Sequence, residues 1–369
     1  LIILLLIGSL AGTWLLSGIV PAMIYYGLEI LNPTIFLFAT CIICSIVSLA
    51  TGSSWSTVAT VGIALLGIGK ALGISEGIIA GAIISGAYFG DKMSPLSDTT
   101  NLAPAMAGTD LITHIKYMAY TTIPSISLAL IIFLIMGFTG NTTYDASSVE
   151  VLQNAIASKI NINPILFVVP IAVIFMIVKK IPAIPALFAG SILGGVFGII
   201  FQPHLLDSIS GINDNIVKSS YVAVINAMTT DISIVTDNEM VNELLATGGM
   251  KGMLNTIWLI ICAMSFGGIM EATGMLQCIT SSIIKLAKNV GSLIFTTGAT
   301  SFLFNVTAGD QYLAIVVPGR MFANEFKDRK LAPEVLSRTL EDTGTVTSAL
   351  IPWNTCGAYH AGVMGVATG

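Results

Sequence analysis

The sequence predicts an all-α integral membrane protein with inverted repeats, each with a re-entrant hairpin and a broken transmembrane helix, plus scaffold helices. Of the 369 residues, 54% are apolar and only 9% are charged, whereas a soluble protein carries about 25% charged residues. The apolar runs are long, which indicates helices rather than the alternating strands of a barrel. Two polar strings, 90–101 and 341–355, interrupt the apolar sequence in corresponding places. Charges at membrane depth persist only where they line a cavity or bind something.

Two of the apolar segments are each expected to fold as a hairpin. A spanning helix needs about 20 residues, so 33–70 and 290–323 are too long for one span and too short for two. Each is broken by polar residues near its middle, at 51–57 and at 305–311. Two half-length helices that meet at a polar tip inside the membrane would explain both segments.

An internal repeat supports this organisation. The matching pairs are Gly18 with Gly274, Thr51 with Thr307, and Asp91 with Asp342. We therefore expect a first repeat over 1–106 with hairpin 33–70 and broken helix 77–106. Scaffold helices and a long loop follow over 107–252. The second repeat, 253–369, has hairpin 290–323 and broken helix 336–368. Paired breaks in two halves of a membrane protein are typical of secondary transporters.

The distribution of basic residues predicts the orientation. Nine of the fifteen lysines and arginines fall in 179–180, 285–288 and 320–338. The loop 204–251 instead has six acids, including Asp214, against two lysines. By the positive-inside rule, 320–338 is cytoplasmic and 204–251 is external. The membrane is expected to be the inner (plasma) membrane of a cell.

Composition and missing motifs exclude other classes. The pI of about 5.1 argues against nucleic acid as a partner. No phosphate-binding GxxxxGK[ST] loop is present, so ATP drive is not encoded, and no catalytic constellation suggests an enzyme. We expect no cofactor. The chain starts and stops inside apolar stretches, so both ends of the natural protein are expected to lie outside this sequence.

The first break offers oxygen ligands that suit a hard cation such as Na⁺. The candidates are Asp91, Ser94, Asp98, Thr99, Thr100 and Asn101, and from the hairpin tip that is expected to face them, Ser53, Ser54, Ser56 and Thr57. Asp98 is the preferred carboxylate for binding protons and cations, with Asp91 beside it. Burial disfavours a charged carboxylate and a bound cation restores it, so one acid can exchange H⁺ for Na⁺ by competition. Lys92 either neutralises a neighbouring acid or extends to the interface.

The second break and its hairpin tip offer a similar set. The candidates are Asp342, Thr343, Ser348, Asn354 and Thr355, and from the tip Asn305, Thr307 and Asp310. Glu341, Thr345 and Thr347 stand in the same string. Asp310 is a lone acid near the tip of an apolar hairpin, and a structural role would require a partner that the sequence does not identify.

These strings resemble a known family. The stretch that carries the resemblance reads Gly90-Asp91-Lys92-Met93-Ser94-Pro95-Leu96-Ser97-Asp98-Thr99-Thr100-Asn101. It is similar to the diagnostic stretch of NhaC-type Na⁺/H⁺ antiporters, as is Pro352-Trp353-Asn354-Thr355-Cys356-Gly357. The resemblance implies a transport domain of two hairpins and two broken helices that moves against a dimerising scaffold in an elevator-like way. It also implies a homodimer.

The expected function is exchange of Na⁺, or Li⁺, for H⁺ by a secondary transporter. The same family includes exchangers of malate and Na⁺-lactate, so a small-carboxylate antiporter of the same fold is the first alternative. Such a substrate needs a cationic cradle, and Lys92 is the only basic residue in the two strings. A cation channel is the second alternative, although a channel does not require inverted halves with titratable breaks.

Replacing Asp98 with Asn is expected to abolish coupled exchange, because the amide cannot bind a proton and Na⁺ in turn. The test is Na⁺-driven proton flux in proteoliposomes, with the amount of folded protein in the membrane as control. Normal flux in D98N would contradict the role of Asp98.

Overall fold

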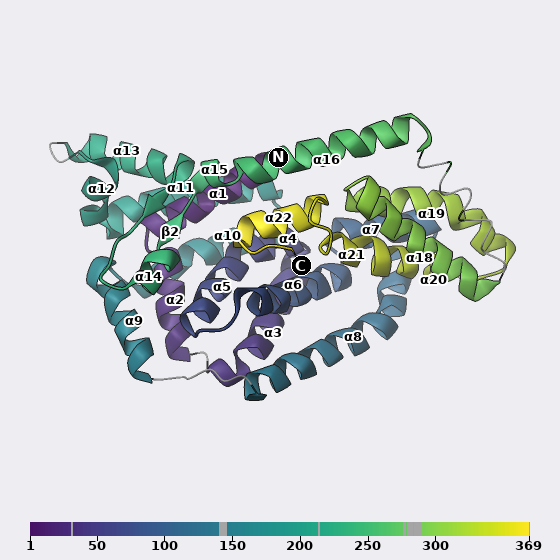
Figure 1. The fold of residues 1–369 in the computed structure, drawn as a ribbon, viewed down its shortest axis with the longest axis horizontal. Helices are drawn as coiled ribbons and strands as arrows, with labels where there is room; N and C mark the ends of the chain where they lie inside the picture. The colour runs from purple at the N-terminus through teal and green to yellow at the C-terminus, as the bar shows by residue number, and fades with distance from the viewer. Residues whose placement is uncertain are drawn as a thin grey trace. The chain divides into compact units, whose positions relative to one another are not determined.

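The computed structural model describes residues 1–30, 32–139, 146–212, 215–275 and 289–368, together with 278 and 283. Lys285, Lys288 and Asp214, on which the predicted orientation partly rests, lie outside these ranges. The described chain is almost entirely helical, as expected (Figure 1). Its one sheet is a short antiparallel pair, β1 (Ile232–Ser233) with β2 (Ala246–Thr247).

The helices follow in a simple order. The first part of the chain contains α1 (Ile2–Leu16), α2 (Ile19–Ile30), α3 (Pro33–Thr51), α4 (Ser54–Thr57), the π-helix η1 (Val58–Gly62), α5 (Ile63–Ala71), α6 (Glu76–Met93) and α7 (Asp98–Ala107). The middle contains α8 (Leu111–Thr139), α9 (Ala146–Lys159), the 3₁₀-helix η2 (Pro164–Phe167), α10 (Val168–Val178), α11 (Ala183–Phe201), α12 (Pro203–Ser210), α13 (Ile216–Thr229), α14 (Glu239–Leu244) and α15 (Gly249–Gly252). The last part contains α16 (Leu254–Ala272), α18 (Val290–Thr307), α19 (Gln311–Asp328), α20 (Pro333–Leu340), the π-helix η3 (Glu341–Thr345), α21 (Val346–Ser348) and α22 (Thr355–Met364).

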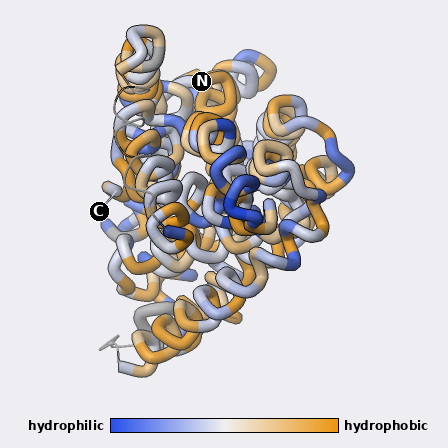
Figure 2. The backbone as a smooth tube through the Cα atoms, turned by 90° about the vertical axis from the view of Figure 1, so that its right-hand side faces the viewer, coloured by the Kyte–Doolittle hydropathy of each residue, from blue (hydrophilic) through white to orange (hydrophobic). Residues whose placement is uncertain are grey.

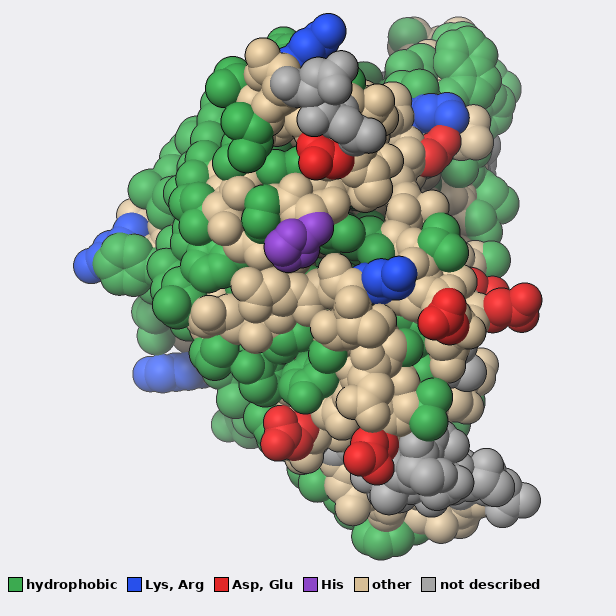
Figure 3. All heavy atoms as spheres, turned by 90° about the vertical axis from the view of Figure 1, so that its left-hand side faces the viewer, with side chains coloured by type: hydrophobic (Ala, Val, Ile, Leu, Met, Phe, Trp, Pro, Cys, Tyr) green, Lys and Arg blue, Asp and Glu red, His purple; other side chains and the backbone are tan. Residues whose placement is uncertain are grey.

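Several helices are suited to a membrane. Five of the described helices are long and apolar enough to cross one, or up to seven if two bent helix pairs each count as a span. Most turns of the chain are hydrophobic in Figure 2. One face of the molecule shows mainly apolar and small polar side chains, with scattered charges (Figure 3). The prediction of a multi-pass, all-helical membrane protein is confirmed.

The two expected hairpins are broken at glycines. Gly52 separates α3 from α4 with φ +69°, and Gly309 separates α18 from α19 with φ +66°. These left-handed conformations favour glycine because it lacks a Cβ. The expected half-length first arms are wrong, since α3 has 19 residues and α18 has 18, each enough for a span. The polar residues 51–57 run from the end of α3 into the second arm, whereas 305–311 cover the end of α18, the break and the first residue of α19. Re-entry itself stays a prediction.

Both broken helices are interrupted within the polar strings. α6 ends at Met93 and α7 begins at Asp98, so residues 94–97 form the first break. In the second string α20 continues as the π-turn η3 and α21, and residues 349–354 then separate α21 from α22. A π-turn inserts an extra residue per turn and is frequent at functional sites.

The stretch 204–251 is folded, which corrects the expectation of a long loop. It contains α12, α13, α14, α15 and the β1–β2 pair. Asn215 and Asn238 cap α13 and α14 with their side-chain oxygens. Its acids and moderate hydropathy obscured these short helices, because a helix that is not fully apolar gives no membrane signal.

The chain forms two compact units. The first comprises 1–44, 56–84 and 130–255, and the second comprises 45–55, 85–129 and 256–369. The second unit therefore contains both hairpin tips at Gly52 and Gly309 and both helix breaks. It also includes the first part of α8, whose segment 117–138 was expected among the scaffold helices.

The first unit is organised around α1. This helix packs against α11, α13 and α15, and the indole N–H of its Trp14 donates to the carbonyl of Gly190 at 3.3 Å. Gly12 lies so close to α13 that a Cβ there would overlap the carbonyl oxygen of Ala227. Small residues permit such close approach, which is a common way of packing helices in membranes.

The core of the second unit lies between α18, α19 and α20, which pack against one another (Figure 1). Its fully buried apolar residues are Ala103, Leu293, Ile315, Phe322, Phe326, Leu336 and Leu340. This core fixes α7, which supplies Ala103, and η3, which follows Leu340 directly.

Replacing Gly12 with Ala is expected to destabilise the protein by about 1–3 kcal/mol, because the new methyl group must push α1 away from α13. Gly81→Ala in α6 is the matched control, since nothing lies within 4 Å of a Cβ at Gly81. Thermal unfolding in detergent measures both variants. Equal midpoints for G12A and G81A would contradict the close packing.

Candidate functional site

Asp91 lies at the centre of the first break. It stands in the last turn of α6 and is 8% exposed. Its Oδ2 accepts hydrogen bonds from the backbone N–H of Ser54 at 3.0 Å and from the Ser54 hydroxyl at 2.6 Å. Ser54 begins α4 just after Gly52, so the first hairpin tip reaches the first broken helix through this carboxylate.

Backbone contacts hold the same tip against the same break. The Ser48 hydroxyl donates to the carbonyl of Ala87 at 2.5 Å, and the Ser94 hydroxyl donates to that of Leu49 at 2.8 Å. A Cβ on Gly90 would come within 2.5 Å of Ser45 and Leu49 backbone atoms. The end of α6 and the end of α3 are therefore in direct backbone contact.

Several predicted ligands instead satisfy the backbone of the first break. The Thr100 hydroxyl donates to the carbonyls of Asp91 and Lys92, both at 3.1 Å. Ser97 caps α7 by accepting from the N–H of Thr100, and the Asn101 amide donates to the carbonyls of Pro95 and Ser97. These side chains pair groups that a broken helix leaves open.

Asn305 plays the corresponding part at the second break. Its amide donates to the carbonyl of Gly344 at 2.6 Å and to the Thr347 hydroxyl at 2.9 Å. Its own side-chain oxygen accepts from the amide of Asn354 at 3.0 Å. The N–H of Thr355 donates to the carbonyl of Gly309 at 2.8 Å. The second tip is thus hydrogen-bonded to both sides of the second break.

An ion pair links the two breaks within the second unit. Lys92 is 5% exposed, and its Nζ lies 2.5 Å from Oδ1 of Asp342. The Thr121 hydroxyl of α8 donates to Asp342 Oδ2 at 3.0 Å, and Arg338 Nε lies 3.9 Å from the same oxygen. Lys92 therefore neutralises an acid instead of extending to an interface.

Glu341, next to Asp342, is the most deeply buried of these acids. It is fully buried, and neither carboxylate oxygen has a hydrogen-bond partner among the residues that the structure describes. Lys92 and Asp91 are close enough to act on its charge, and the hydroxyls of Thr99 and Thr345 are its polar neighbours.

The other predicted residues lie in varied settings. Asp98 is exposed in the first turn of α7, within electrostatic range of Tyr312. Asp310 caps α19 by accepting from the N–H groups of Tyr312 and Leu313, which supplies the structural partner that the sequence did not reveal.

The predicted hydroxyl residues mostly bond to nearby backbone. Thr307 and Thr343 donate one turn back along the helix, to the carbonyls of Leu303 and Thr339. The Ser348 hydroxyl donates to the carbonyl of Thr345. Ser53 lies in the first tip, whereas Ser56 and Thr57 are buried residues of the first unit.

Sequence reasoning missed the contributions of α8 and of an aromatic group. Thr121 and His114, whose Nδ1 lies 2.8 Å from the Ser337 hydroxyl, come from a segment with no polar break. The Trp55 ring stacks on that of Tyr359 at 4.0 Å, and the Tyr359 hydroxyl donates to the carbonyl of Trp55. Nothing in an uninterrupted apolar pattern distinguishes Thr121 and His114 from ordinary helix packing, whereas Trp55 stands within the polar break 51–57.

The buried charges of the site are mostly acidic. Asp91 and Glu341 are buried, and the charge of the buried Lys92 is already neutralised by Asp342, which is partly exposed. A buried carboxylate without a counter-charge is costly. The geometry therefore suits the binding of a cation or a proton. Among the described residues no cluster of three metal-ligating side chains was found.

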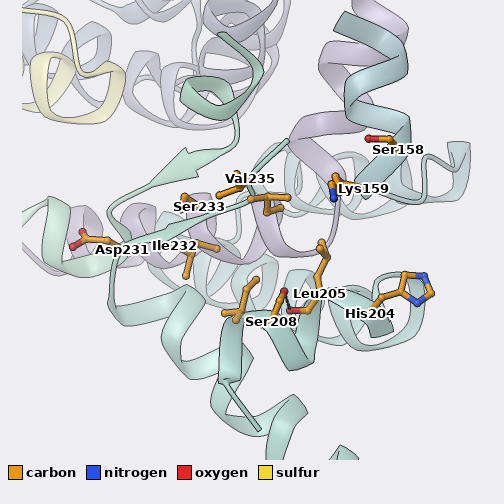
Figure 4. Close-up of a pocket in the computed structure, with 11 residues that line it drawn as sticks. Ser158, Lys159, His204, Leu205, Ser208, Asp231, Ile232, Ser233 and Val235 are labelled. Carbon is orange, nitrogen blue, oxygen red and sulfur yellow. Dashed lines mark hydrogen bonds between the residues drawn. The ribbon is translucent and has the colours of Figure 1, made fainter. Parts of the chain in front are cut away.

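A cavity elsewhere does not involve these residues. It lies in the first unit, has a volume of about 760 Å³ and is lined by residues of α9, α12 and the β1 region, including Lys159, His204 and Asp231 (Figure 4). None of the residues predicted from the two breaks lines it.

Buried acids at paired helix breaks in an almost all-helical membrane protein are typical of secondary transporters. A family model described as the Na⁺/H⁺ antiporter family matches residues 86–368. The chain belongs to this family, and the resemblance to NhaC-type antiporters is confirmed.

Curated relatives agree with the family but differ in substrate. The chain is 38% identical over 368 residues to the malate-2H⁺/Na⁺-lactate antiporter of Bacillus subtilis (strain 168), covering 100% of this chain and 75% of that protein. It is 37% identical over 364 residues to the Na⁺/H⁺ antiporter NhaC of Alkalihalophilus pseudofirmus, covering 99% and 76%. It is 36% identical over 368 residues to the arginine/ornithine antiporter ArcD of Halobacterium salinarum, covering 99% and 73%.

Replacing Asn305 with Asp is expected to destabilise the protein by about 1–3 kcal/mol, because a carboxylate oxygen would face the carbonyl of Gly344 without a donor. Thr307→Ser is the matched control, since the Thr307 hydroxyl donates within α18, to the carbonyl of Leu303. Thermal unfolding in detergent compares the two. An unchanged midpoint in N305D would contradict the role of Asn305 at the second break.

Proposed function

We propose that this protein exchanges Na⁺, or Li⁺, for H⁺ across the inner membrane of the cell. The observation that carries the proposal is the buried excess of carboxylates at the two breaks, with Lys92 engaged by Asp342. That these acids form the ion-binding site is part of the proposal. The family match and the NhaC relatives support the exchanged ions.

Asp91, which is buried, takes the place of the exposed Asp98 as the proposed central cation ligand. Its carboxylate is held in place by the two donors of Ser54, so its position does not depend on the ion. Carboxylate, hydroxyl and carbonyl oxygens suit a hard cation such as Na⁺. A proton and Na⁺ relieve the same buried negative charge, and each therefore disfavours binding of the other. This competition couples the two fluxes.

The proposed movement is elevator-like. The second unit contains both hairpin tips, both helix breaks and the Lys92–Asp342 pair, so the ligands can travel together. The first unit is the proposed scaffold, and a homodimer through it remains part of the proposal. Inverted repeats are supported by the left-handed glycines at the matched positions Gly18 and Gly274, with φ +81° and +72°. We further propose that 320–338 is cytoplasmic and 204–251 external, following the positive-inside rule.

A small-carboxylate antiporter is the second candidate, favoured by the malate-2H⁺/Na⁺-lactate relative at 38% identity. An organic anion needs a cation or free N–H groups at its site. Lys92 could provide this only if Asp342 released it. The pairing of Lys92 with Asp342 therefore supports the cation over the anion.

Proteoliposomes with an imposed pH gradient and an internal pH dye test the proposal. Addition of Na⁺ to the wild type is expected to dissipate the gradient, whereas K⁺, malate and lactate are not. Asp91→Asn is expected to lose the response to Na⁺, because the amide lacks the charge that binds the cation. Asp207→Asn is the control, since Asp207 bonds to Ser219 in the first unit, whereas both breaks belong to the second. A response only to malate or lactate would move the function to the organic-acid exchanger.

A further inference from the structure

Glu341 has a combination of properties that no other acid of the site shares. It is fully buried, and both of its carboxylate oxygens lack a hydrogen-bond partner in the described part of the chain. Asp91 receives two hydrogen bonds from Ser54. Asp342 has Lys92 as counter-charge and the Thr121 hydroxyl as donor. Asp98 is exposed.

The surroundings of Glu341 compensate its charge only in part, through Lys92 and the hydroxyls of Thr99 and Thr345. Of the helices that pack against η3, α18 carries no charged residue and α19 presents Ala314 and Ile315. α7 contributes Thr99, while its acid Asp98 is exposed. Within α20 the nearest base is Arg338, which approaches Asp342. From α6, Lys92 and Asp91 act on Glu341 with opposite signs.

A buried carboxylate in this setting is costly to keep ionised, unless a cation or a proton is bound to it. The donors of Ser54 and the pairing with Lys92 lower this cost for Asp91 and Asp342. Glu341 is therefore the acid of the site that most needs a bound proton or cation.

We propose that Glu341 carries the exchanged proton, while Asp91 is the ligand that stays ionised for the cation. This inference rests on the proposed function and assigns proton binding and cation binding to two different acids. In the cation-free site Glu341 is protonated. When Na⁺ binds beside Asp91, the added positive charge favours the ionised form of Glu341, and one proton leaves. The net charge of the site is the same in both forms, which permits both to cross.

Infrared difference spectroscopy on purified wild-type protein at neutral pH tests the proton site directly. The Na⁺-free protein is expected to show the C=O band of a protonated carboxyl group, and Na⁺ is expected to remove it. In Glu341→Gln the band is expected to be lost, together with Na⁺-driven proton flux in proteoliposomes. Wild-type Na⁺ affinity is expected to fall about tenfold for each unit of decrease in pH below neutrality, since one proton is displaced per Na⁺.

Control variants separate this role from a structural one. Glu334→Gln removes a partly exposed glutamate from the same helix, where it accepts from the Thr109 hydroxyl, and is expected to retain the band and the flux. Glu341→Asp keeps a carboxyl group, so a shifted band is expected even if E341Q unfolds.

The outcomes distinguish the two proposals. A carboxyl band that survives in folded E341Q, or its absence from the wild type, overturns the role of Glu341 whatever the substrate is. If Na⁺ leaves the wild-type band unchanged but malate or lactate removes it, the result contradicts only the proposed Na⁺ exchange. Glu341 then remains the proton site. Retained Na⁺-driven proton flux in E341Q overturns the inference while supporting the proposed function.

Discussion

A helix that breaks inside an apolar layer leaves N–H and C=O groups that water cannot satisfy, and the architecture of the second unit follows from this constraint. At the first break the hydroxyl of Thr100 and the amide of Asn101 pair the open carbonyls. At the second, the amide of Asn305 does so for Gly344. Each hairpin tip lies against its break because polar partners are available there. Most polar side chains of the two strings thus serve the backbone, which leaves only a few acids for ions.

The acids differ because their partners differ. Asp342 is held by Lys92, Asp91 by Ser54, and Asp310 by the first N–H groups of α19. Carboxylates of similar intrinsic chemistry therefore become an ion-pair partner, the proposed cation ligand and a helix cap. A site of this kind can bind two ions of equal charge in turn without a dedicated pocket for each, because the environment decides which acid responds to which ion.

The sequence predicted much of this arrangement and missed the rest for physical reasons. The breaks at Gly52 and Gly309 could be found because polar residues and glycine interrupt long apolar runs. The position of Asp98 could have been inferred more closely, since a Ser at position 97 is a helix-capping signal that places Asp98 in the first turn of α7. The contact of Thr121 with Asp342 could not have been inferred, because α8 is uninterrupted and a single hydroxyl in an apolar helix has no distinctive pattern. The family was recognised from one string, whereas the relatives show that the same family holds several substrates.

The Lys92–Asp342 pair has a consequence for how the protein is made. The two residues are 250 positions apart in the chain, so Lys92 is synthesised long before its acid exists. A lysine in an apolar helix without a partner is costly in the membrane. Until the last part of the chain arrives, α6 must keep Lys92 near water or near another acid such as Asp91. Nascent chains truncated before Asp342 would expose an unpaired charge within the bilayer, which gives membrane quality control a feature by which to recognise incomplete molecules.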